Sequence, residues 1–256
     1  MSTQPPFSVY VYTDPMPLKF SGFPQAGLDF LKKLKKNNNR DWFNARKETF
    51  DLQVKAPMVT LVETYNSHLT KLAPHNLNPP AKAIYRIYRD TRFSQDKTPY
   101  KTHIGAIFPR EGMEKHASAG YFFSIGADGI EFAAGLYMPQ PDQLLAVRNH
   151  IAENHQQFRR IVENKALRQL IGDMKGEQLT RPPKGFASDH PAVDYLRHKR
   201  WIFYDDQTID LSTATSPKLL DLFLARTKAL APFVNFLNQP LLSLRKRKET
   251  TRELFE

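Results

Sequence analysis

The sequence has no cysteine among its 256 residues. This absence excludes thiol nucleophiles, zinc ribbons, cysteine-ligated iron–sulfur clusters and any framework of disulfides. Such cross-links are not needed at this length, because one fold of this size removes roughly three-quarters of its unfolded surface from water. We therefore expect a fold held by hydrophobic packing, in a reducing compartment such as the cytoplasm.

Long hydrophobic runs are also absent. No stretch approaches the roughly 18 consecutive apolar residues of a membrane-spanning helix. Residues 1–17 contain four prolines and no lysine or arginine, so they lack the basic start and the apolar core of a signal peptide. We therefore expect a cytoplasmic protein without a membrane partner, in which residues 1–19 form a proline-rich lead.

The common motifs of catalytic and cofactor sites are missing. The eight histidines form neither His-x-His nor His-Glu-x-x-His, the spacings typical of zinc sites. The sequence has no Gly-x-Ser-x-Gly elbow, no Walker-type loop and no Gly-x-Gly-x-x-Gly loop. We therefore predict no metal and no other cofactor. A magnesium ion held by Asp90 and Asp96 with the help of phosphate oxygens is the weaker alternative.

Positive charge, by contrast, is abundant. Lysine and arginine total 37 against 26 aspartates and glutamates, a net charge of +11. Such an excess favours anionic partners, among them nucleic acid and phosphorylated metabolites, although it also occurs for solubility alone. Its distribution is therefore more informative than its sum. Residues 241–256 are rich in charge and poor in apolar side chains, and we expect a frayed tail that adds little stability.

Apolar spacing predicts three helices near the start of the chain. Leucines recur at spacing three over residues 28–34, with lysines on the other side. Asn38 is expected to cap a second helix over residues 42–52. Pro57 suits the first turn of a third helix that ends near Leu72, because the first turn needs no donor from its backbone nitrogen.

The middle of the chain is typical of β-structure. Short strands are predicted at residues 83–88, 103–108, 119–126, 130–137 and 200–204. Asp128-Gly129 predicts a hairpin between the third and fourth of these. Helical spacing returns over residues 139–162 and after Thr215-Ser216-Pro217, an N-cap followed by proline. Residues 20–240 are therefore predicted to form a single α+β domain, with a central, mainly antiparallel sheet, an N-terminal helical layer and C-terminal covering helices.

The most informative segment runs from Arg86 to His103. It carries five lysines and arginines and two aspartates, a formal charge of +3 over 18 residues. If residues 84–88 form a strand, Arg86 shares one face with Ile84 and Tyr88. A guanidinium among apolar neighbours is costly unless an anion or a carboxylate meets it, and its planar fork suits both.

These residue types predict a site for a small phosphorylated or carboxylated ligand. The expected ligand-binding residues are Arg86, Arg89, Arg92, Lys97, Tyr100 and Lys101, and the candidate catalytic residues are Asp90, Asp96 and His103. The arginines would hold the anion, the lysines would add charge and Tyr100 a hydroxyl. An aspartate would act as general base or metal contact, and His103 as general acid–base, because histidine titrates near working pH. We expect at least three of the five cationic side chains to converge on one cleft with Asp90 or Asp96.

Three alternatives remain open at this point. In the first alternative, the segment only braces a long loop. The aspartates would then pair with neighbouring arginines, and Phe93 and Tyr100 would anchor the loop in the core. His103, which opens a strand, would then be structural as well. A non-catalytic nucleic-acid-binding or assembly module would use the same basic surface more broadly. If a small ligand does bind, simple binding and hydrolysis or transfer are equally compatible with the sequence, which gives no oligomeric state.

The sequence Tyr-Arg-Asp-Thr-Arg-Phe-Ser-Gln-Asp-Lys-Thr-Pro-Tyr-Lys-Thr-His of residues 88–103 resembles the hallmark of the domain of unknown function 2461 family. Asn39-Arg40-Asp41-Trp42-Phe43 with Arg46, and Gly135-Leu136-Tyr137-Met138-Pro139, resemble two further motifs of that family. The similarity extends from Phe20 to Leu237. It implies one domain with a site near the central motif, and it assigns no catalytic role to any residue.

Overall fold

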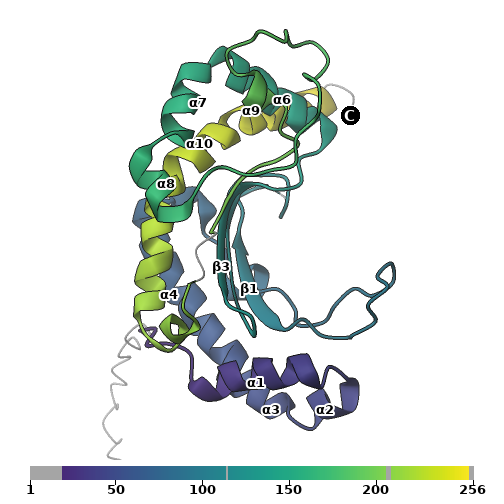
Figure 1. Ribbon diagram of the computed structural model, residues 1–256, viewed down its shortest axis with the longest axis vertical. Coiled ribbons are helices and arrows are strands. Elements are labelled where there is room, and N and C mark those ends of the chain that lie inside the picture. The colour runs from purple at the N-terminus through teal and green to yellow at the C-terminus, as the bar shows by residue number, and fades with distance from the viewer. Residues whose placement is uncertain (1–18, 114, 206–208, 254–256) are drawn as a thin grey trace, which may run out of the picture.

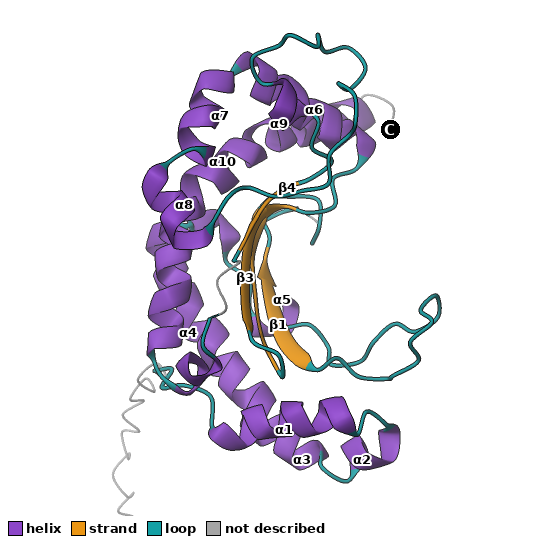
Figure 2. Ribbon diagram, in the orientation of Figure 1, coloured by secondary structure: helices purple, strands orange, loops and turns teal. Residues whose placement is uncertain are grey.

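The computed structural model describes residues 19–113, 115–205 and 209–253, with side chains up to residue 247. The predicted lead of residues 1–19 therefore lies almost entirely outside the described residues. In Figures 1 and 2 a curved sheet stands at the centre, with helices behind it and at both of its ends. No helix within the described ranges combines the length and the apolar character needed to span a bilayer.

The N-terminal layer consists of helices that follow one another closely. They are α1 Gln25–Lys36, α2 Arg40–Asn44, α3 Lys47–Phe50, the π-helical turn Asp51–Lys55 and α4 Ala56–Leu72. The side chain of Asn39 accepts a hydrogen bond from the Trp42 N–H at 2.9 Å, so Asn39 caps α2. The prediction that Asn38 would be this cap is wrong, because the side chain of Asn38 is bound to Tyr100 instead.

The π-helical turn follows from Pro57. Pro57 lies in the first turn of α4 as predicted, but the helical path begins earlier, at Lys47. Because proline has no N–H, the carbonyl of Gln53 lacks its usual partner four residues on. Gly27 of α1 packs on this carbonyl, and a Cβ at Gly27 would lie only 2.1 Å from the Gln53 oxygen. A glycine at residue 27 therefore allows α1 to approach the helix behind it.

Residues 83–88 do not form the strand that we predicted. The 3₁₀ turn Pro74–Asn76 and the helix α5 Pro80–Ala83 precede them, and only Ile84 and Tyr88 form isolated bridges, to Ala106 and Tyr100. The chain bends between these two bridges, so no continuous ladder can form. The segment still runs along the outer edge of the sheet.

The sheet has four antiparallel strands in the order of the sequence. They are β1 His103–Phe108, β2 Gly120–Gly126, β3 Ile130–Leu136 and β4 Trp201–Tyr204. The predicted hairpin between β2 and β3 is confirmed. Its turn lies one residue earlier than expected, because the Gly126 N–H donates to the Gly129 carbonyl at 2.8 Å and leaves Ala127 and Asp128 as the loop.

The C-terminal part of the chain covers the sheet with helices. They are α6 Pro141–Glu153, α7 His155–Val162, α8 Lys165–Ile171, α9 Val193–Leu196, the 3₁₀ helix Leu211–Thr215 and α10 Lys218–Glu253. The helix predicted over residues 139–162 is interrupted at Asn154. Ser216 caps α10 by accepting from the Lys218 N–H at 3.2 Å. Helix α10 continues past residue 240, and Leu241 is buried.

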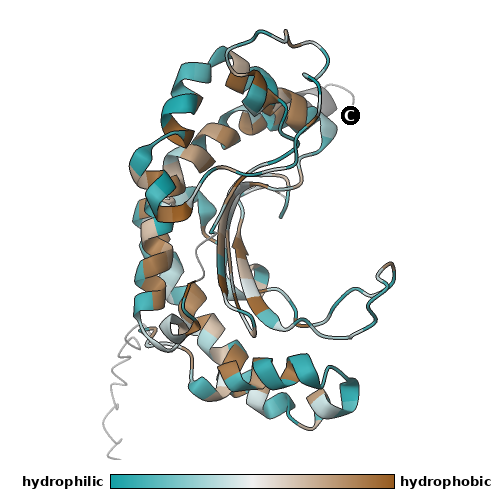
Figure 3. Cartoon of the chain, viewed as in Figure 1, coloured by the Kyte–Doolittle hydropathy of each residue, from teal (hydrophilic) through white to brown (hydrophobic). Residues whose placement is uncertain are grey.

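The two faces of the sheet differ in character. One face packs against α10, where the ring of Phe123 stacks on that of Phe223 with centroids 4.4 Å apart. The same face packs against α4, where Tyr65 meets the rings of Phe108 and Phe123 edge to face. The register places Phe122 and Ala133 opposite each other on the other face. This second face, which we call the open face, looks into the hollow of the C-shaped outline in Figure 1. Figure 3 shows hydrophilic and hydrophobic segments alternating along the covering helices, as packing on a sheet requires.

Candidate ligand-binding site

The predicted motif forms a long loop at the edge of the sheet, residues 86–101, which we call the arm. In Figure 1 it extends from the end of the sheet beside β1 away from the body of the protein. Its two ends are joined by backbone hydrogen bonds, from the Arg89 N–H to Pro99 at 2.9 Å and from the Lys101 N–H to Ile87 at 2.8 Å. The arm therefore leaves and rejoins the sheet edge at one place.

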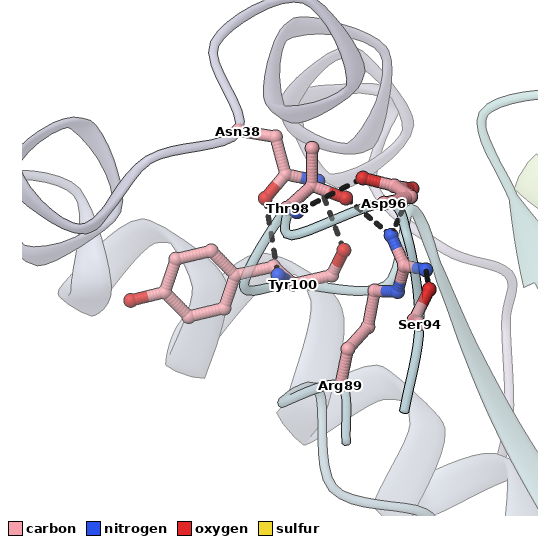
Figure 4. A network of polar contacts seen from close by, with 6 residues as sticks. All are labelled: Asn38, Arg89, Ser94, Asp96, Thr98 and Tyr100. Atoms are coloured by element: carbon pink, nitrogen blue, oxygen red, sulfur yellow. Dashed lines mark hydrogen bonds and ion pairs between the residues drawn. The ribbon is translucent and has the colours of Figure 1, made fainter. Parts of the chain in front are cut away.

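Arg89 and Asp96 brace the inside of the arm (Figure 4). The guanidinium of Arg89 contacts the Asp96 carboxylate and the Thr98 hydroxyl, and donates to Ser94 Oγ at 3.5 Å. Asp96 also accepts from the Thr98 N–H at 2.9 Å. The hydrogen bond from the Thr98 backbone, together with Arg89, lowers the pKa of Asp96 to about 2. Both residues are thus engaged in holding the shape of the arm.

Arg92 and Lys97 are also bound by neighbouring groups within the arm. The Arg92 guanidinium donates to both oxygens of Asp90, at 3.0 and 2.7 Å, and lowers the pKa of Asp90 to about 2. Lys97 Nζ donates to the Thr91 carbonyl at 2.9 Å, and Arg86 is exposed. The expectation that at least three cations converge on one cleft with Asp90 or Asp96 is therefore wrong. Arg89 and Arg92 are instead neutralised by aspartates seven and two positions away in the sequence.

Tyr100 anchors the arm to the N-terminal helices. Asn38 donates to the Tyr100 carbonyl at 2.9 Å and accepts from the Tyr100 N–H at 3.0 Å (Figure 4). The Tyr100 ring is buried and stacks on Phe43, with centroids 4.1 Å apart and planes at 17°. Phe93, the second anchor considered in the sequence, is 95% exposed at the far end of the arm. The brace alternative therefore describes Tyr100 correctly and Phe93 wrongly.

A pocket of about 380 Å³ lies on the open face of the sheet. Its apolar lining includes Tyr85, Ile107, Phe122, Ala133, Tyr137 and Ile202, and its polar lining Lys101, His103, Lys115, His116, Ser118 and Tyr204. Gly120 and Gly135, which are paired across β2 and β3, also line the pocket. The volume falls within the range of small-molecule sites. Of the predicted site residues, this lining includes Lys101 and His103.

Two lysines meet on one aromatic ring at the edge of this pocket. Lys115 Nζ lies 3.7 Å and Lys101 Nζ 5.0 Å from the centroid of Tyr85. Burial lowers the pKa of both lysines, and Lys101 lowers that of Lys115 further. Burial also raises the pKa of Tyr85 to about 12. Within the described part of the chain neither lysine forms an ion pair, so their charges are not offset by a carboxylate.

The pocket histidines are poised to be neutral. Burial lowers the pKa of His103, and Lys101 acts in the same direction, while the carboxylate of Glu131 opposes them. Burial and the charge of Lys115 lower the pKa of His116. A neutral imidazole can donate or accept a hydrogen bond, which leaves the predicted acid–base role of His103 chemically possible.

A second cavity of about 310 Å³ adjoins the pocket and shares His103 and Tyr204 with it. Here Glu131 accepts hydrogen bonds from Ser124 Oγ at 2.8 Å and from the Tyr204 hydroxyl at 2.9 Å. Elsewhere, no group of three or more His, Asp or Glu side chains within the described ranges is arranged to hold a metal.

The predicted site residues did not include four that line the two cavities, namely Tyr85, Lys115, Glu131 and Tyr204. A partial signal was present, because alternation along the predicted hairpin places Phe122, Ser124, Glu131 and Ala133 on one face. The sequence did not indicate which face the helices would cover.

The fold and the pocket define a class: an α+β protein whose four-stranded antiparallel sheet carries helices on one face and a lysine-bearing pocket on the other. The sequence model of the family described as Conserved hypothetical protein (DUF2461) matches residues 26–236. The chain therefore belongs to this family, as its motifs indicated. Searches of curated proteins and of solved structures found no match.

Proposed function

We propose that the pocket on the open face binds a small phosphorylated or carboxylated ligand. The observation that carries this proposal is the pair Lys101 and Lys115 on the ring of Tyr85, with no carboxylate paired to either among the described residues. Burial lowers the pKa of both ammonium groups, and repulsion from Lys101 lowers the pKa of Lys115 further. An anion between them would relieve this repulsion.

The surroundings of the lysines suit a ligand with an apolar part. Tyr85 and Phe122 meet edge to face, with centroids 6.2 Å apart, and offer an aromatic wall beside the two cations. Each charge-assisted hydrogen bond to the anion would contribute about 1.5–3 kcal/mol. The concave shape favours a small ligand over a nucleic-acid duplex, which needs a flat or convex basic surface.

In this proposal the arm positions the ligand site and does not grip the ligand. The contacts of Arg89 with Asp96 and Thr98 hold the arm, and Asn38 holds Tyr100. These contacts fix the end of the arm, from which Lys101 enters the pocket and the chain continues to His103. The basic motif thus serves the site through its last residues, and the remaining charges keep the arm in shape.

The proposal is tested by titration calorimetry with 4-ethylphenyl phosphate as the probe. Lys101→Met and Lys115→Met should each weaken binding at least about tenfold, the size of one lost charge-assisted hydrogen bond. Methionine keeps most of the contact with Tyr85 and removes the charge. Lys228→Met, on the exposed side of α10, is the matched control and should bind like the wild type.

Unchanged affinity in both pocket variants, or an equal loss in the control, would contradict the proposal. The nucleic-acid alternative gives a different result: the wild type would bind duplex DNA, with an affinity that falls steeply with salt at a log–log slope of about −0.9 per phosphate contact. Hydrolysis is a second candidate, because His103 faces the pocket in a near-neutral state. Release of inorganic phosphate from the probe, lost in His103→Gln, would support it.

A further inference from the structure

We infer that the ligand of this pocket carries an amino group in addition to its anionic group, and that Glu131 binds this amino group. The inference rests on the proposed function, because the same molecule must reach the lysines. It specifies a zwitterionic ligand class, in which an anion and an ammonium group are separated by an apolar middle.

The carboxylate of Glu131 is held in place with acceptor capacity to spare. Ser124 stands directly opposite it on β2 and donates to Oε2 at 2.8 Å, and the Tyr204 hydroxyl donates to Oε1 at 2.9 Å. A carboxylate offers about four lone-pair sites, so these two donors occupy about half of them. The remaining lone-pair sites can accept hydrogen bonds from a ligand in the second cavity, because the side chain of Glu131 lines that cavity.

The charge of Glu131 has no fixed counterpart. Its two partners, Ser124 and Tyr204, are neutral donors, and the ion pairs between described residues do not include Glu131. His103 shares the cavity wall, but burial outweighs the attraction of Glu131 and keeps its pKa low. A half-buried carboxylate without a cation is costly, and an ammonium group of a ligand would offset that cost.

The two cavities together form one site with two poles. They share His103 and Tyr204, so a single ligand can extend from one into the other. Lys101 and Lys115 make the positive pole beside the β1 edge, and Glu131 on β3 makes the negative pole. Charges of opposite sign at the two ends orient a dipolar ligand and disfavour one with anions at both ends.

Two matched probes test the inference on the full chain. Tyramine phosphate carries a phosphate and an amino group at opposite ends of a phenyl ring, and 4-ethylphenyl phosphate is nearly the same molecule without the amino group. Calorimetry should show that the wild type binds tyramine phosphate about tenfold more tightly or better, the gain expected of one charge-assisted hydrogen bond.

Glu131→Gln should remove this preference and leave the affinity for 4-ethylphenyl phosphate unchanged within about twofold. If the variant does not fold, the comparison of the two probes in the wild type still tests whether the amino group of the ligand strengthens binding. Lysine-dependent binding of both phosphates with equal affinity would overturn this inference and leave the proposed function standing. Binding of neither phosphate would overturn both. A preference for tyramine phosphate that persists in Glu131→Gln would also overturn it, because another residue would then hold the amine.

Discussion

Asn38 and Tyr100, which are 62 positions apart in the sequence, form a reciprocal pair: the Asn38 amide donates to the Tyr100 carbonyl at 2.9 Å and accepts from its N–H at 3.0 Å. An asparagine side chain with one donor and one acceptor in this arrangement extends the backbone pairing of the arm into the N-terminal layer. Lys101, the next residue along the chain, enters the pocket. The contact thus links the helical layer to the candidate site.

Asn38→Ala should lower the free energy of unfolding by about 1–3 kcal/mol, because the partly buried N–H and carbonyl of Tyr100 lose their partners. Urea denaturation measures this change. Asn37→Ala, at the exposed neighbouring position, is the matched control and should cost less than about 1 kcal/mol. Equal stability of Asn38→Ala and the wild type would show that the pair does not anchor the arm.

Arg89 and Arg92 should differ in their importance for the arm, although both pair with an aspartate. The Arg89 side chain is 25% exposed and bridges Asp96 and Thr98, whereas the Arg92 side chain is 77% exposed. Arg89→Ala should loosen the arm and accelerate its cleavage by chymotrypsin at Phe93 severalfold. Arg92→Ala should change the rate little, because exposed pairs contribute about 0–1 kcal/mol. Equal cleavage rates in both variants would contradict the bracing role of Arg89.

Stability should fall on mild acidification. Burial lowers the pKa of His103, and also those of His116, His150 and His198. Their folded-state pKa values therefore lie below the unfolded value of about 6.5, and the unfolded chain takes up more protons as the pH falls. The contribution of these histidines to the free energy of unfolding is therefore fully present above about pH 7 and declines towards pH 5.

Replacing a single histidine isolates its share of this pH dependence. His103→Gln should lose less stability between pH 7 and pH 5 than the wild type, because glutamine takes up no proton in the unfolded chain. His68→Gln, at an exposed position of α4, is the control. Urea curves at the two pH values measure the effect, and an unchanged slope in His103→Gln would exclude His103 as a contributor.

Local features of the fold were predictable because they depend on neighbouring residues. The leucine spacing of α1, the β2–β3 hairpin and the N-cap of α10 all follow from interactions within a few positions. The errors lie where distant residues or the path of the backbone decided the outcome. Asn38 and Asn39 are equally good caps, and a long-range partner for Asn38 selected between them. Residues 84–88 have strand-like composition, but a bend prevents a continuous ladder.

The sequence by itself therefore determined the fold class, the family and the segment that leads into the site. Only the tertiary structure decided that Arg89 and Arg92 pair with the aspartates of the arm, and that Lys101 and Lys115 meet on the ring of Tyr85. The physical reason is that the charged and aromatic residue types of the arm are equally suited to bracing a loop and to binding a ligand. The outcome depends on which face of the sheet the distant helices α4 and α10 bury, because burial alone turns an alternating strand pattern into a core on one side and a pocket on the other.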